Sequence, residues 1–187
     1  ASAELRAELE RLRKVTEATH VAGNAATTFS PDAPAEIAVG VPELPTDFRR
    51  TDTIEKLCRD LTRRSDTLTA GFWGMGGIGK TVTGAALVRD DAVRDFYDQI
   101  VWLPLGQAPV IEKLQSSAME QLTGLPMDPS LSEEDKHAAL REAFKGKRVL
   151  LALDDLWEER HKAQLNFVDP SSGSRVLIST RIRHLLS

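Results

Sequence analysis

The chain has 187 residues, of which 41% are apolar and 28% charged, enough for one α/β domain with a full core plus a modest appendage, and too few for two complete domains. Its formal charge of −4, with acids and bases interspersed, argues against nucleic acid as a partner. The only cysteine is Cys58, which excludes a disulfide framework and a cysteine-rich zinc site. The start ASAELRAELERL lacks the apolar core of a signal peptide, and no apolar run reaches membrane-spanning length, so we expect no membrane partner and a cytoplasmic location.

The first 44 residues differ in composition from the rest. Residues 1–20 carry Leu5, Leu9 and Leu12 at helical spacing, which predicts an amphipathic helix. Two heptads are marginal for a coiled coil, so both a tail helix and a partner-binding helix remain open. Residues 21–44 are rich in Ala, Thr, Pro and Gly, which is typical of a linker or an extended surface segment. The folded domain is expected over 45–187, and the absence of an initial methionine suggests a piece of a longer protein.

From Thr53 onward, apolar strands alternate with helices. The first helix repeats apolar residues at helical spacing and should bury Cys58. Ser132 and Asp135 form a capping box for a later helix that ends at Gly146. Strands are expected at 68–73, 99–105, 149–155 and 175–180, and further helices at 79–89, 109–123 and up to 145. This alternation predicts an α/β fold, a three-layer sandwich whose mostly parallel central sheet is covered on both faces and binds ligands beyond the carboxyl ends of its strands.

A glycine-rich loop follows the first predicted strand and opens a helix. Its residues fill the pattern G-x-x-x-x-G-K-S/T, and that pattern holds nucleotide phosphates when it joins a strand to a helix. Glycines let backbone N–H groups curl around a phosphate, and the helix start adds partial positive charge. Lys80 would bind the β and γ oxygens, and the hydroxyl of Thr81 would bind Mg²⁺. The expected binding residues are Gly74, Met75, Gly76, Gly77, Ile78, Gly79, Lys80, Thr81 and Val82.

Two carboxylates follow the apolar strand at 149–153. This is the Walker B arrangement, in which Asp154 would hold Mg²⁺ directly or through water. For Asp155 three roles remain open: it orients the attacking water, caps the next helix, or joins the outer shell of the metal. An aspartate, one methylene shorter than the glutamate of fast ATPases, favours slow turnover.

The last predicted strand ends in Ser179, Thr180 and Arg181, polar residues placed to contact a γ-phosphate. Arg181 would then distinguish a triphosphate from a diphosphate; the alternative is a solvated arginine at the end of a strand. The guanine-reading pattern N-K-x-D is absent, because Phe167 stands where its lysine would be in 166–169. Adenine is therefore the expected base.

Four segments together resemble the nucleotide-binding part of an NB-ARC domain, in the STAND class of P-loop NTPases. They are GMGGIGKT at 74–81, FYDQIVWLPL at 96–105, LLALDDLW at 150–157 and GSRVLISTR at 173–181. The family is the ATP/ADP switch of plant immune receptors and of the animal apoptosome ATPase. The resemblance covers 45–187 and implies the roles of phosphate residue for Lys80, phosphate and Mg²⁺ residue for Thr81, metal carboxylate for Asp154, catalytic acid for Asp155 and γ-phosphate sensor for Arg181.

The same resemblance extends to the surroundings of the loop. It implies that PTDFRRTD at 45–52 helps to enclose adenine, which assigns Phe48 and Arg50 to the adenine site, although the segment departs from the family's Val-Gly-Arg form. It implies that the strand before Arg181 lies between the strand before the loop and the Walker B strand. The ARC helical and winged-helix parts, with their Gly-x-Pro and Met-His-Asp motifs, are not in this sequence.

Three functions are compatible with these residues. The leading hypothesis is a switch that binds ADP at rest and ATP when active, with slow Mg²⁺-dependent hydrolysis as a reset. Its expected partners are the adenine nucleotide and the flanking ARC and sensor-repeat domains, together with nucleotide-dependent self-association. The alternatives are a turnover P-loop ATPase or kinase, and an interaction scaffold without catalysis.

Overall fold

The computed structural model describes residues 33–63 and 68–186. The predicted helix over residues 1–20 lies outside this part of the chain, as do residues 21–32 of the predicted linker. Within the described ranges, no helix is long and apolar enough to cross a membrane.

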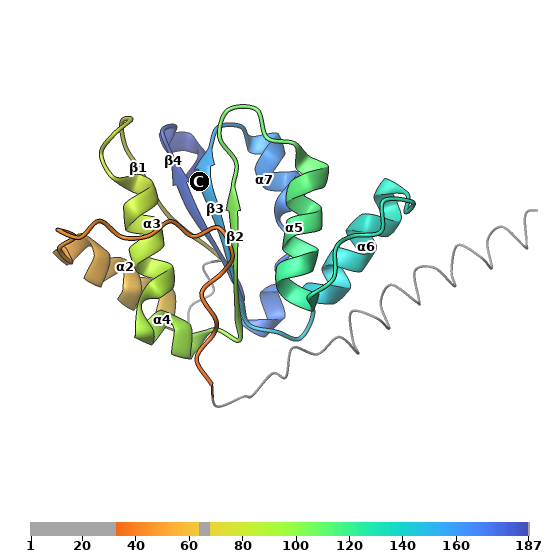
Figure 1. Ribbon diagram of the computed structural model, residues 1–187, viewed down its shortest axis with the longest axis horizontal. Helices are drawn as coiled ribbons and strands as arrows, with labels where there is room; N and C mark the ends of the chain where they lie inside the picture. The colour runs from red at the N-terminus through yellow and green to blue at the C-terminus, as the bar shows by residue number, and fades with distance from the viewer. Residues whose placement is uncertain (1–32, 64–67, 187) are drawn as a thin grey trace, which may run out of the picture.

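A parallel sheet forms the centre of the molecule (Figure 1). Its order is β1 (Thr69–Trp73), β4 (Arg175–Thr180), β3 (Val149–Leu156) and β2 (Gln99–Pro104), and every neighbouring pair is parallel. The α/β fold class is thereby confirmed. The strand that precedes Arg181 lies between the strand before the glycine loop and the Walker B strand, as the resemblance implied.

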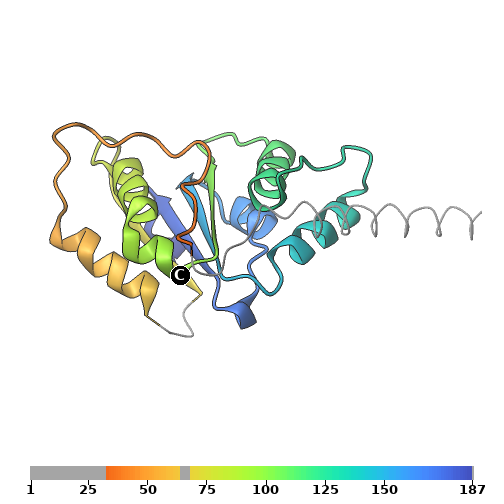
Figure 2. The ribbon, with the colours of Figure 1, turned by 60° about the horizontal axis from the view of Figure 1, so that its bottom comes forward.

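Helices cover both faces of this sheet, as Figures 1 and 2 show. One face carries α2 (Asp52–Thr62), α3 (Lys80–Arg89) and α4 (Asp91–Phe96), and the other carries α5 (Ile111–Thr123), α6 (Glu133–Phe144) and α7 (Glu159–Leu165). Because side chains alternate along a strand, β3 serves both layers: Leu150 and Ala152 pack with α2–α4, whereas Leu151 and Leu153 pack with α5–α7. The three-layer arrangement therefore follows from a strand that is apolar on both faces.

Capping residues and glycines in the sequence account for most of the helix boundaries. Ser132 accepts a hydrogen bond from the backbone N–H of Asp135 at 3.2 Å and begins α6, and Gly146, at φ +70°, follows its end, so the predicted cap and stop are confirmed. The first helix begins one residue earlier than predicted, at Asp52. The sequence did not predict α4, α7 or the 3₁₀ turns η1 (Pro170–Ser172) and η2 (Arg183–Leu186), because seven residues or fewer show no clear period.

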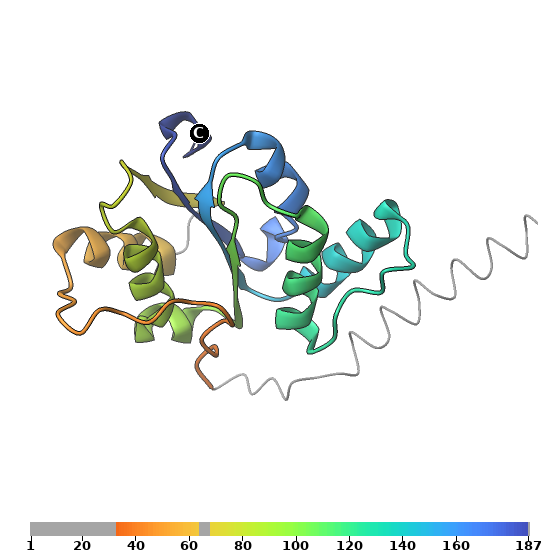
Figure 3. The same ribbon diagram turned by 45° about the horizontal axis from the view of Figure 1, so that its top comes forward.

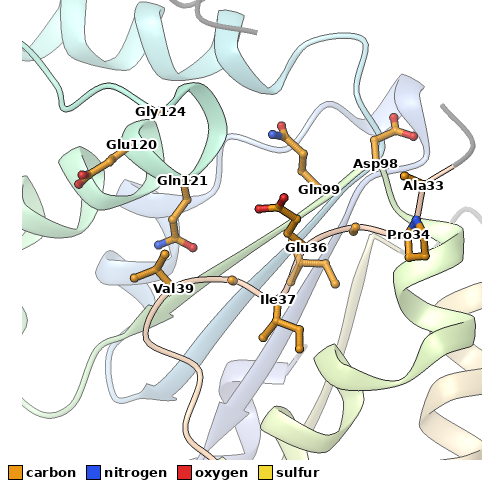
Figure 4. A pocket seen from close by; sticks show the side chains of 13 residues that line it. Ala33, Pro34, Glu36, Ile37, Val39, Asp98, Gln99, Glu120, Gln121 and Gly124 are labelled. Atoms are coloured by element: carbon orange, nitrogen blue, oxygen red, sulfur yellow. The ribbon is translucent and has the colours of Figure 1, made fainter. Parts of the chain in front are cut away.

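The described part of the predicted linker, residues 33–44, packs against the domain. Ala35 and Ala38 are buried, and Ala35 exchanges two hydrogen bonds with Arg94 at 2.9 and 2.8 Å. Of the two interpretations, the extended surface segment describes these residues. Between this segment, the start of β2 and the end of α5 lies a hollow of about 310 Å³, lined in part by Glu36, Asp98 and Gln121 (Figure 4). It lies at the amino end of β2, away from the glycine loop.

Candidate nucleotide-binding site

The glycine loop joins β1 to α3 at the carboxyl end of the sheet, which is the end that comes forward in Figure 3. Gly77 and Gly79 have φ of +78° and +88°, values that an L side chain rarely adopts. Gly79 is the N-cap of α3 and provides no side-chain cap, so the first N–H groups of the helix are left for a ligand. The backbone thus has the form and the partial charge of an anion cradle.

Lys80 folds back over this cradle. Its side chain is buried, and its Nζ donates hydrogen bonds of 2.9 Å to the carbonyl oxygens of Gly74 and Met75. These contacts keep the ammonium group next to the loop, where a phosphate would meet it. The donors around the loop therefore fit a polyphosphate.

Thr81 and Asp154 meet across the loop. The hydroxyl of Thr81 donates to Asp154 Oδ2 at 3.0 Å, and the hydroxyl of Ser179 donates to Asp154 Oδ1 at 2.5 Å. A hydroxyl and a carboxylate are ligands that Mg²⁺ prefers, provided that phosphates and water complete its octahedron. Among the described residues, no group of three His, Cys, Asp or Glu side chains gathers to hold a metal without such help. The pair therefore fits a metal that arrives with a nucleotide.

Asp155 lies in a distorted part of β3. Two residues, Asp154 and Asp155, stand opposite the single Ser179 of β4, so the register shifts, and Asp155 takes φ +56°. Its backbone N–H donates to Ser179 Oγ at 2.9 Å, while its carboxylate accepts from Trp157 Nε1 at 3.0 Å. The helix-capping alternative is wrong, because Glu158 is the N-cap of α7.

Arg181 directly follows β4 and reaches both the loop and Asp155. Its Nε lies 3.4 Å from Asp155 Oδ1, and its guanidinium lies over the ring of Trp157, 5.1 Å from the ring centre. A Cβ placed on Gly76 would come within 2.8 Å of Arg181 Nη1, so the guanidinium rests against the glycine loop. Although its side chain is 43% exposed, Arg181 is paired, unlike the solvated arginine of the alternative interpretation. The loop, the two carboxylates and Arg181 are thus brought together.

The two residues assigned to adenine, Phe48 and Arg50, make contacts within the domain. Phe48 is half-buried against the core cluster of α2–α4. Arg50 donates a hydrogen bond to Asp90, which raises the pKa of its guanidinium, and Asp90 follows the last residue of α3. Since α3 has 10 residues and rises about 1.5 Å per residue, the ion pair lies roughly 15 Å from the loop end of the helix. Contact of Phe48 or Arg50 with adenine stays a prediction.

Residues 50–187 match the NB-ARC domain family. The chain belongs to this family. Disease resistance protein UNI of Arabidopsis thaliana is 30% identical over 119 residues, which cover 62% of this chain and 13% of that protein. Disease resistance protein RGA2 of Solanum bulbocastanum is 29% identical over 140 residues, 73% of this chain and 14% of that protein. The NB-ARC chain thus spans about one seventh of the length of these relatives.

The match confirms the family predicted from the four segments and, with it, a nucleotide-binding domain. Two contacts of this NB-ARC domain were not predicted. The γ-phosphate contact expected of Ser179 stays a prediction, and its contacts with Asp154 and with the backbone N–H of Asp155 are new. Trp157 was noted only as part of LLALDDLW, and its spacing of two residues from Asp155 is the signal that could have suggested a contact.

Proposed function

We propose that this NB-ARC domain binds ADP and ATP together with Mg²⁺ and serves as the switch of a cytoplasmic, immune-receptor-like signalling protein. ADP is held at rest, ATP when the protein is active, and slow hydrolysis resets it. The disease resistance proteins that it resembles support the signalling context. The flanking ARC and sensor domains, and self-association in the ATP state, belong to the same proposal.

The observation that carries the proposal is the meeting of three segments at one end of the sheet. Lys80 reaches the carbonyls of the loop, Thr81 touches Asp154, and Arg181 touches Asp155. The loop and Lys80 would bind the β-phosphate, which both nucleotides carry. Arg181 would bind the γ-phosphate, which only ATP carries, so that the two nucleotides leave the domain in different states.

Magnesium would be held by the Thr81 hydroxyl and the Asp154 carboxylate. When bound, it neutralises phosphate charge and draws electron density from the γ-phosphorus. The protein's own residues orient the reactants: Ser179 fixes Asp154, and Asp155 would accept a proton from the attacking water. The carboxylate of Asp155 also contacts Arg181 and Trp157, which fix its direction.

Calorimetric titration with ADP and ATP in the presence of Mg²⁺ tests this function. Lys80→Ala should weaken binding of both nucleotides roughly 10- to 100-fold, because it removes a charged hydrogen bond to phosphate. Lys113→Ala is the matched control, since Lys113 is exposed on α5, and it should bind like the parent chain. Unchanged ADP affinity in Lys80→Ala would contradict the site.

Steady-state hydrolysis separates a switch from a working ATPase. The switch predicts turnover well below the rate of about 10 per second that is typical of enzymes. A rate near that value in the parent chain would favour the turnover ATPase instead. Absence of binding in the titration would leave the scaffold.

A further inference from the structure

Trp157 contacts two charged side chains, that of Asp155 near the end of β3 and that of Arg181 directly after β4. Its indole Nε1 donates a hydrogen bond of 3.0 Å to Asp155 Oδ2. The guanidinium of Arg181 lies over its ring, 5.1 Å from the ring centre, in a cation–π contact. Arg181 in turn lies 3.4 Å from the other oxygen of the same carboxylate, Oδ1. The three side chains therefore form a closed triangle, which we call the Trp157 triangle, beside the glycine loop.

The contacts between the three side chains of the Trp157 triangle differ in strength. The indole bond has good length for a hydrogen bond to a charged oxygen, and one acceptor satisfies the single N–H of Trp157. The contact of Arg181 with Asp155 is long, and the arginine side chain is 43% exposed, so solvent screens it. A phosphate that carries more charge than a carboxylate would draw Arg181 away, whereas the indole would keep its hold on Asp155.

The backbone conformation of Asp155 explains why the direction of its carboxylate depends on these contacts. Asp155 has a φ of +56°, the only positive φ among the non-glycine residues that the structure describes, and it stands at the register shift of β3. A side chain on such a turn is not aligned by the regular pleat of the strand, so its direction depends on its partners. Ser179 holds the backbone N–H of Asp155, and Trp157 and Arg181 hold the carboxylate.

We propose that Trp157 is a positioning residue that couples Asp155 to Arg181: it keeps the carboxylate in place and supports Arg181 until a γ-phosphate takes the guanidinium. The inference rests on the proposed function, because it needs ATP in the site. In hydrolysis, a bond forms between the water oxygen and the γ-phosphorus while the bond from the γ-phosphorus to the bridging oxygen breaks. ADP leaves with that electron pair, and Asp155 takes the water proton. Trp157 sets the direction of Asp155 in this step and contributes nothing to holding ADP.

The decisive variant is Trp157→Phe, which keeps an aromatic ring beneath Arg181 and removes only the indole N–H. Single-turnover hydrolysis of ATP should fall about tenfold, as expected for one hydrogen bond to a charged group. The ADP dissociation constant, measured by calorimetry, should stay the same. In an Asp155→Gly background, where glycine accepts the positive φ, Trp157→Phe should cause no further loss.

Trp73→Phe is the matched control. Trp73 also carries an arginine over its ring, Arg183 at 5.5 Å, and it ends β1 next to the same loop, but it is 54% exposed. This variant should leave both the hydrolysis rate and the ADP affinity unchanged. A rate loss as large as that of Trp157→Phe would show that any tryptophan near the loop matters, and would overturn the inference.

Failure of the inference and failure of the proposed function give different results. If the parent chain binds neither nucleotide, the function itself fails, and the inference fails with it. If nucleotides bind to the parent chain, two results overturn only the inference. One is that Trp157→Phe hydrolyses ATP at the parent rate; the other is that its ADP affinity falls by the same factor as its hydrolysis rate. An additional loss in the Asp155→Gly background would likewise show that Trp157 does not act through Asp155.

Discussion

Replacing Gly76 by alanine should displace Arg181 from the glycine loop. A Cβ at this position would lie 2.8 Å from Nη1, closer than these two atoms can approach, and 3.4 Å from the central carbon of the guanidinium. Gly76 does not have a positive φ, so alanine is compatible with its backbone. Because the crowded atom is the end of a long, flexible side chain, Arg181 should move and the loop should stay.

The cost to folding is expected to be small. Arg181 would lose an exposed ion pair worth about 0–1 kcal/mol and a cation–π contact worth about 0.5–1 kcal/mol. Against this, alanine in place of glycine reduces the entropy of the unfolded chain by about 0.4–1 kcal/mol. The net change is at most a loss of about 1.6 kcal/mol, so the domain should remain folded.

The effect on nucleotide choice is expected to be large. If Arg181 contacts only the γ-phosphate, that contact is worth about 1.5–3 kcal/mol, which favours ATP over ADP roughly 10- to 150-fold. Calorimetric titration of Gly76→Ala with each nucleotide should show ADP affinity near that of the parent chain and a reduced ratio of ATP to ADP affinity.

The neighbouring glycine provides the control. Gly77→Ala introduces a side chain at φ +78°, where a left-handed residue costs about 1–2 kcal/mol, and no described atom lies within 4 Å of the new Cβ. This variant should weaken both nucleotides equally. If Gly76→Ala leaves the ratio of affinities unchanged, Arg181 does not read the γ-phosphate from its place beside the loop.

Three further outcomes are expected. Arg175→Met should lower the free energy of unfolding, measured in urea, by about 2–3 kcal/mol, because the buried guanidinium donates to the carbonyl oxygens of Asp60 and Arg63 at the end of α2. A loss below about 0.5 kcal/mol would mean that water satisfies both carbonyl oxygens equally well in the variant. Burial raises the pKa of the Cys58 thiol to about 11, so alkylation of the native domain by iodoacetamide should be slow near neutral pH and accelerate only as the pH approaches that value; fast labelling near neutral pH would contradict it. Asp154→Asn should make ADP affinity insensitive to Mg²⁺, and a titration that responds equally to the metal with and without the substitution would remove Asp154 from the metal site.

The sheet and the loop could be predicted because each residue there carries its own signal. The strand Val149–Leu156 is apolar on both faces, so it must lie between two layers of helices. The loop has glycines where the backbone takes positive φ, and a lysine and a threonine where phosphate and metal chemistry need them. These are properties of short stretches, which a sequence displays directly.

The contacts of Asp155 could not be predicted because they depend on tertiary placement. A register shift between β3 and β4 turns Asp155 onto a positive φ, and nothing in the letters LLALDDLW marks that turn. Arg50 gives a second example. The resemblance assigned it to the adenine site, which stays a prediction, and its contact with Asp90 at the far end of α3 was not predicted.

The position of β4 in the sheet decides which groups the chain after it can touch. Neighbouring strands lie about 4.8 Å apart, so a strand between β1 and β3 places its carboxyl end one spacing from both the glycine loop and the two aspartates. At the outer edge beyond β2, the same residues would lie at least two spacings from Asp154. Because β4 occupies the central place, Ser179 holds Asp154 and Arg181 holds Asp155, while the carbonyl of Thr180 accepts from the N–H of Gly74. If a γ-phosphate drew Arg181 away from Asp155, the change would therefore occur at the end of the same strand that also contacts Asp154 and the glycine loop.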